Sequence, residues 1–156
     1  MKKSLLLTLA LVAAVLCGSE ALAQEKEKTG SRREPDPSVL RDPVLEQDSK
    51  KNLSVARQYF SLKKAYRASS ARAEEIIAGN PNFSKADEAY YIAGMSHLRL
   101  SRKQGAQPPN LKPEKHREEA RVLLSQLVNA HPDSKFRKEA EKELESIGGL
   151  IKTTGN

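Results

Sequence analysis

The chain has 156 residues, 27 Lys and Arg against 20 Asp and Glu, a formal net charge of +7 and a single Cys. This length fits one domain, and a single Cys excludes a disulfide within the chain. Because 30% of the residues are charged and 38% are hydrophobic, the core must be a thin layer between amphipathic elements.

Residues 1–23 have the features of an export signal. Two lysines follow the first Met, residues 5–16 form an apolar stretch, and a small-x-small site precedes Gln24. The apolar stretch is shorter than the roughly 20 residues that a membrane-spanning helix needs. We therefore predict cleavage between Ala23 and Gln24. The alternative is lipidation at Cys17, which is less favoured because the residue before it is Leu rather than a small residue.

Export makes nucleic acid a poor explanation for the positive charge, and no nucleic-acid partner is predicted. Acidic lipid headgroups or acidic partner surfaces explain the charge better, so association with a membrane surface stays open. A well-solvated surface is the simplest interpretation.

Residues 24–42 are mostly charged residues, Pro and Gly, and predict a tether because they bury too little apolar surface to offset the entropy of ordering. Asp42 followed by Pro43 is typical of a helix N-cap and first helical residue. Apolar residues at helical spacing continue this helix to Phe60. Two interpretations then stay open: a turn over residues 63–65, or one helix that runs on into the next.

A helix over residues 66–79 follows, with an apolar face of Tyr66, Ser69, Ala73, Ile76 and Ile77. Asn80 precedes Pro81 and is pushed out of helical geometry, and we expect a left-handed conformation at Gly79. Residues 84–87 predict a capping box that starts the next helix. Its stripe contains small residues that let two helix axes approach closely: Ala86, Ala89, Tyr90, Ala93, Gly94 and His97.

Residues 102–113 are rich in Pro and polar residues and predict an irregular insertion. Pro113 then opens a helix with the stripe Ala120, Leu123, Leu124, Leu127 and Val128. After Pro132, Asp133 or Ser134 caps a last helix that ends at two glycines, and residues 148–156 are predicted to form a flexible tail.

The pattern of residues occurs twice. A shift of 51 positions (132 − 81) superimposes the two prolines and several stripe residues: Ser69 on Ala120, Ala73 on Leu124, Ile76 on Leu127, Ala89 on Ala140 and Ala93 on Leu144. One duplicated helical hairpin explains this better than chance.

These spacings resemble the tetratricopeptide repeat family, whose helix pairs carry a small residue twelve positions before the proline that closes the second helix, as Ser69 and Pro81 do. The resemblance covers roughly residues 50–147. A closer resemblance is to the BamD-like lipoproteins of outer-membrane β-barrel assembly, which carry a signal sequence and repeats of this kind. The matching segments are Ala56 to Phe60, Tyr66 to Glu75, Asn80 to Ser84, Tyr90 to Leu98 and His131 to Ser134.

Periodicity and resemblance together predict an all-α fold over residues 43–147, with two tetratricopeptide-like hairpins plus a C-terminal capping helix in a short solenoid. The resemblance implies a non-enzymatic protein-interaction scaffold in the periplasm or at the periplasmic face of the outer membrane. Its implied partners are envelope proteins or peptides, including outer-membrane assembly components. A general periplasmic adaptor and, less favoured, an enzyme acting on cell-wall polymer are the alternatives.

No catalytic, cofactor or metal site is predicted. His97, His116 and His131 are expected far apart on different helices, without the spacing of metal ligands. Neighbouring carboxylates lie among Lys and Arg at helical spacing, which indicates solvated, ion-paired helix faces.

Tyr91, Met95 and Leu98 form a second apolar stripe on their helix. A helix that is apolar on two sides is usually sandwiched between neighbours, so a core role is favoured. The alternative is a partner-binding groove, because the first helices of stacked repeats line the concave surface in this family. Cations at its rim would then hold an extended segment: Arg57 and Lys64 from the preceding first helix, and Arg102 at the loop edge.

Overall fold

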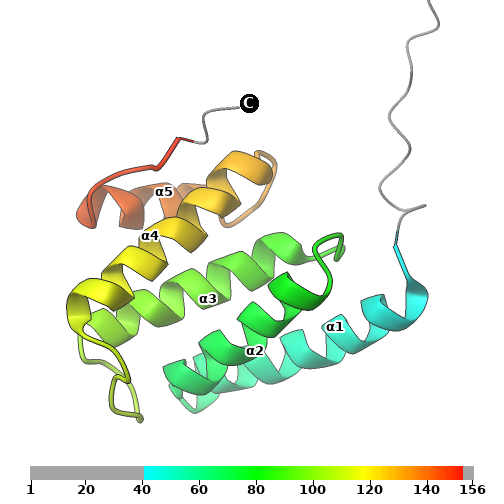
Figure 1. The fold of residues 1–156 in the computed structure, drawn as a ribbon, viewed down its shortest axis with the longest axis horizontal. Coiled ribbons are helices and arrows are strands. Elements are labelled where there is room, and N and C mark those ends of the chain that lie inside the picture. Colours follow the sequence, from blue (N-terminus) through cyan, green and yellow to red (C-terminus); the bar gives the residue numbers. More distant parts are fainter. Residues whose placement is uncertain (1–40, 153–156) are drawn as a thin grey trace, which may run out of the picture. The chain divides into compact units, whose positions relative to one another are not determined.

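The computed structural model describes residues 41–152, whose regular secondary structure is helical (Figure 1). The predicted signal with Cys17, Ala23 and Gln24, and the tether up to residue 40, lie outside the described residues. The elements are α1 (Pro43–Arg57), η2 (Gln58–Leu62), α2 (Tyr66–Gly79), α3 (Ala86–Ser101), α4 (Pro113–Ala130) and α5 (Arg137–Ser146). None of the described helices is long and apolar enough to cross a membrane.

Each helix packs mainly against its neighbours in the chain, as Figure 1 shows. The pair of α1 and α2 and the pair of α3 and α4 form two hairpins, and α5 packs against α4. The described part of the chain contains no strand. The predicted all-α fold of two hairpins and a capping helix is therefore confirmed.

The first helix begins where the sequence predicts. The Oδ1 atom of Asp42 accepts a hydrogen bond from the N–H of Val44 at 2.7 Å, and Pro43 occupies the first helical position. At its other end the helix widens into the π-helical turn η2, and the chain then turns, with a positive φ of 48° at Lys64. The turn, rather than one continuous helix, is therefore the correct alternative.

The two proline turns after α2 and α4 have the same backbone structure. The residues that follow the two helices, Asn80 and His131, have φ and ψ of −144° and 78° and of −128° and 70°. In both turns the N–H three residues further on donates to that carbonyl at 3.1 Å, from Phe83 to Asn80 and from Ser134 to His131. Identical turns at a 51-residue shift support the internal repeat on structural grounds.

Two local predictions near the first turn are wrong. Gly79 is the last residue of α2 and is not among the residues with positive φ, because Asn80 leaves helical geometry by itself. No side chain within α3 caps that helix. Instead, the Ser84 N–H and hydroxyl donate to Glu46 of α1, and Asp87 accepts a hydrogen bond from the Ser134 hydroxyl at 2.7 Å. Residues 84–87 thus join three elements rather than forming a local capping box.

The core consists of two apolar clusters that meet on α3. One lies mainly between α1, α2 and the first half of α3, and the other between the second half of α3, α4 and α5. The α3 and α4 helices approach closely at Gly94, where a Cβ atom would lie 2.7 Å from Leu124 Cγ. The predicted role of small residues in helix packing is confirmed at this position.

The insertion between α3 and α4 folds back onto the start of α2. The Ala106 N–H donates to the Lys64 carbonyl at 2.9 Å, and the Gln107 side chain accepts from the Ala68 N–H at 3.1 Å. Gly105 has a φ of 100°, and a Cβ there would lie 2.5 Å from the Lys64 oxygen. The insertion therefore caps a helix that has no side-chain cap of its own.

The C-terminal residues that the structure describes also have definite contacts. Gly148 and Gly149 have positive φ and end α5 as predicted, with the Gly149 N–H donating to the Leu144 carbonyl at 2.8 Å. The following residues are hydrogen-bonded to α4, with the Ile151 N–H donating to Ser125 at 3.0 Å. Gly149 and Ile151 are thus hydrogen-bonded to α4, while the flexible tail of residues 148–156 stays a prediction.

Candidate functional site: the first-helix face

The first helices of the hairpins, α1 and α3, are joined by an ion pair. Arg57 donates to both carboxylate oxygens of Glu88, with a distance of 2.6 Å between Nη2 and Oε2. The Glu88 side chain is 13% exposed, whereas that of Arg57 is 43% exposed. The hydrogen bond to Glu88 raises the pKa of Arg57. This predicted partner-binding cation is therefore already paired within the chain, while part of its side chain still faces solvent.

Tyr91 joins α3 to α5. Its ring stacks on that of Phe136, with centroids 4.5 Å apart and an interplanar angle of 16°, and the Lys135 ammonium lies 4.8 Å from the Phe136 centroid. Burial, and then a hydrogen bond with Glu139, raise the pKa of the Tyr91 phenol. Both rings are only partly buried. We call Arg57, Glu88, Tyr91, Phe136 and Glu139 the first-helix face.

Met95 and Leu98 do not belong to an open groove. Each is 1% exposed and packs in the second apolar cluster against α4 and α5. A side chain that is fully covered in the folded chain offers no surface to a partner. For these two residues the core interpretation holds, and they support the partly exposed Tyr91 from below.

Arg102 and Lys64 both lie after the ends of helices rather than on them. Arg102 follows α3 and donates to Glu143 of α5 at 2.8 Å, so it links two elements. Lys64 is exposed and lies in the turn after η2, not on a first helix, because the helix ends at Leu62. The Lys64 carbonyl accepts the hydrogen bond from the Ala106 N–H of the insertion. The structure thus brings Arg57 and Tyr91 onto one face and leaves Lys64 outside it.

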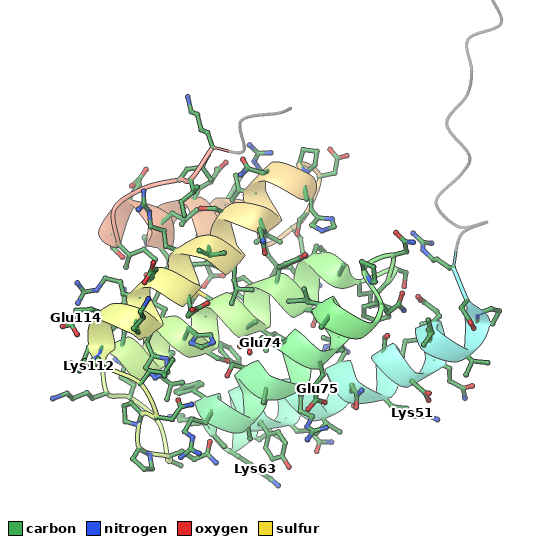
Figure 2. All side chains as sticks on the ribbon, in the orientation of Figure 1. Lys51, Lys63, Glu74, Glu75, Lys112 and Glu114 are labelled. Atoms are coloured by element: carbon green, nitrogen blue, oxygen red, sulfur yellow. The ribbon has the colours of Figure 1, made fainter. Side chains whose placement is uncertain are left out.

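A buried histidine pair is the feature that the sequence interpretation missed. The Nδ1 atoms of His97 and His116 are 2.9 Å apart, and His97 Nε2 is 2.7 Å from a carboxylate oxygen of Glu74. Figure 2 shows Glu74 on the side of α2 that faces α3 and α4. The expectation that these histidines lie far apart is wrong. His97 is close to the end of α3 and His116 close to the start of α4, so an antiparallel hairpin places them opposite each other.

The hydrogen bonds of this pair assign one tautomer to each ring. The Leu111 N–H donates to His116 Nε2 at 3.4 Å, so the proton of that ring is on Nδ1. His97 Nδ1 must then accept this proton's hydrogen bond, and His97 Nε2 donates to Glu74. Burial, and then the charge of His97, lower the pKa of His116. The two histidines therefore connect α2, α3 and α4 to the insertion.

The described residues form no cluster typical of a metal centre. In residues 41–152 there is no group of three or more His, Cys, Asp or Glu side chains that could hold a metal ion. Acidic side chains pair with cations on helix surfaces, as Glu75 does with Arg72 at 2.7 Å and Glu118 with Lys115 at 2.7 Å. The hydrogen bond from Lys115 lowers the pKa of Glu118. A general acid would need the opposite shift.

Stacked helical hairpins with paired surface charges and repeated proline turns define a helical-repeat protein of the tetratricopeptide type. Residues 40–151 match the YfiO family, which is described as outer membrane lipoprotein, and the chain belongs to this family. The resemblance to BamD-like repeat proteins is thereby confirmed. Comparison with curated proteins and with solved structures gives no match.

Proposed function

We propose that the protein is a non-enzymatic protein-interaction scaffold at the periplasmic face of the outer membrane, where it contributes to the assembly of outer-membrane proteins. The observation that carries this proposal is membership of an outer membrane lipoprotein family across nearly all of the helical domain. The paired surface carboxylates support a scaffold rather than an enzyme. Its partners are envelope proteins or peptides.

The first-helix face is the proposed contact for such a partner. Tyr91 and Phe136 offer partly exposed aromatic surface, which is enriched at protein interfaces, and the Lys135 ammonium lies beside it. Arg57 and Arg102 are the proposed cations beside it, and Lys64, which lies outside the first-helix face, is proposed only as a more distant cation. Because Arg57 and Arg102 already pair with Glu88 and Glu143, a partner carboxylate has to share or replace those contacts. Met95 and Leu98 contribute only as the packed layer under Tyr91.

Depletion of the protein in its own cells tests the proposed function. We expect the abundance of folded outer-membrane barrel proteins to fall while periplasmic proteins without a barrel stay unchanged. Expression of the wild-type chain should restore the barrel proteins, and a chain without residues 1–23 should not. Unchanged abundance and folding of barrel proteins would instead favour a general periplasmic adaptor.

A capture experiment tests the proposed contact. The mature wild-type protein and a Tyr91→Ala variant would be compared by pull-down from envelope extract, followed by mass spectrometry, at equal amounts of folded protein. We expect Tyr91→Ala to weaken the binding of the partners by about 1 to 3 kcal/mol, which is the range for an interface aromatic residue. The variant should therefore capture less of each partner than the wild type does. Equal capture by the two proteins would remove Tyr91 from the partner site.

A further inference from the structure

The residues after α5 turn back and are hydrogen-bonded to α4; they are here called the C-terminal segment (residues 147–152). Two glycines of positive φ direct it back along the outer side of α4. Arg121 Nε donates to the Gly149 carbonyl at 2.8 Å, the Ile151 N–H donates to Ser125 Oγ at 3.0 Å, and Asn129 Nδ2 donates to the Ile151 carbonyl at 2.8 Å.

The three side chains that make these bonds are spaced four residues apart on α4. Arg121, Ser125 and Asn129 therefore form one stripe, here called the α4 stripe. All three bonds end on main-chain atoms of the C-terminal segment. A stripe that binds carbonyl oxygens and an amide N–H recognises an extended backbone whatever side chains it carries.

The side chains of the C-terminal segment fill their surroundings incompletely. Ile151 and Ile147 border a hollow of about 360 Å³ beside Val122, and Leu150 borders another of about 250 Å³ beside Leu144. The two successive residues Leu150 and Ile151 line different hollows, so their side chains lie on different sides of the C-terminal segment. Leu150 and Ile151 are still 38% and 39% exposed. The backbone of the C-terminal segment is thus fixed by hydrogen bonds, whereas its apolar side chains are only partly buried.

We propose that the α4 stripe is a binding site for an extended peptide segment of another protein, and that the C-terminal segment is a displaceable internal occupant of this site. The incoming segment would offer its backbone to Arg121, Ser125 and Asn129 and place apolar side chains in the two hollows. This inference rests on the proposed scaffold function for the source of the segment. The α4 stripe is then a second proposed binding surface, separate from the first-helix face.

A peptide-binding measurement on the full mature chain tests the proposal. The probe is a fluorescent peptide with the sequence of residues 147–156. The tail-released variant is Gly149→Val/Ile151→Pro, which strains a position with φ of 79° and removes the N–H that Ser125 accepts. If the C-terminal segment occupies the α4 stripe in about nine of ten wild-type molecules, only about one molecule in ten can bind the probe. We therefore expect the tail-released variant to bind the probe at least about tenfold more tightly than the wild type.

Matched variants separate the site from the segment. Lys152→Ala keeps all three backbone bonds and changes neither hollow, so it should behave as the wild type. Adding Ser125→Ala and Asn129→Ala to the tail-released variant should abolish the gain, and so should a probe N-methylated at the position of Ile151. A probe with Val and Leu in place of its two isoleucines should bind within about threefold, since the stripe contacts only the backbone.

Two results would overturn the proposal. The first is equal probe affinity of the wild type and the tail-released variant when circular dichroism shows both to be folded. The second is a wild-type dimer in sedimentation that the tail-released variant loses, because the natural occupant would then be a second copy of the chain. Either result is independent of the depletion experiment, so the scaffold function can stand when this inference fails.

Discussion

Gly94 sets the distance between α3 and α4, and its replacement by Ala tests the packing described above. A Cβ atom at this position would lie 2.7 Å from Leu124 Cγ and 2.8 Å from Cδ2, and Leu124 is fully buried. Overpacking of this kind costs about 1 to 3 kcal/mol. The higher helix propensity of Ala returns about 1 kcal/mol. We therefore expect Gly94→Ala to destabilise the fold by roughly 0 to 2 kcal/mol.

Gly79 provides the matched control. It is also helical, but no atom lies within 4 Å of the Cβ that Ala would add. Gly79→Ala should therefore stabilise the fold by about 0.4 to 1 kcal/mol. At roughly 4 °C per kcal/mol, the melting temperatures of the two variants should differ by several degrees in thermal unfolding followed by circular dichroism. If Gly94→Ala stabilises the protein as much as Gly79→Ala does, the close approach of α3 and α4 is wrong.

Three further predictions concern single contacts. Tyr91→Ala should lower the free energy of unfolding by about 2 kcal/mol through loss of the stack on Phe136, and denaturant titration showing no change would contradict that packing. Arg57→Leu should cost about 1 to 3 kcal/mol because Glu88 is left largely buried and unpaired, whereas Arg57→Leu with Glu88→Leu should recover most of this loss. The lowered pKa of His116 means that the unfolded chain binds more protons below about pH 6.5, so stability should fall on acidification through that range and His116→Gln should reduce the slope.

The elements whose ends are fixed by local chemistry were predictable from the sequence. Proline cannot continue a helix and restricts the residue before it, so the breaks after α2 and α4 follow from Pro81 and Pro132 alone. The start of α1 follows from Asp42, whose side chain caps the first N–H groups, and from Pro43, whose fixed φ suits the first helical position. The repeat of these signals at a fixed spacing then indicated the fold without any knowledge of the packing.

Contacts between elements were not predictable in the same way. Residues 84–87 have the composition of a capping box, but Glu46 and Ser134 come from elements far away in the sequence and take up the polar groups there. Local propensity describes only the competition within a segment. A polar group from another element replaces the local cap when tertiary packing holds that group at hydrogen-bonding distance. The sequence of residues 84–87 alone does not reveal such a group.

The two histidines show where a further signal was present but unused. Once the hairpin of α3 and α4 is accepted, positions at equal distances from the connecting insertion must face each other, so His97 and His116 become candidates for contact. The insertion itself belongs to this network, because the Leu111 N–H fixes the tautomer of His116. Figure 2 shows Lys112 and Glu114 where the insertion meets α4.

The apolar stripe of Tyr91, Met95 and Leu98 illustrates the limit for a candidate binding surface. Helical periodicity assigns all three residues to one side of α3. It cannot predict how much of that side α5 covers. In the structure Met95 and Leu98 are covered, whereas Tyr91 lies beside Phe136 and stays partly open. The boundary between core and partner surface therefore depends on where the last helix docks. Since only six residues (131–136) separate α4 from α5, the second proline turn at Pro132 determines how much of α3 a partner can reach.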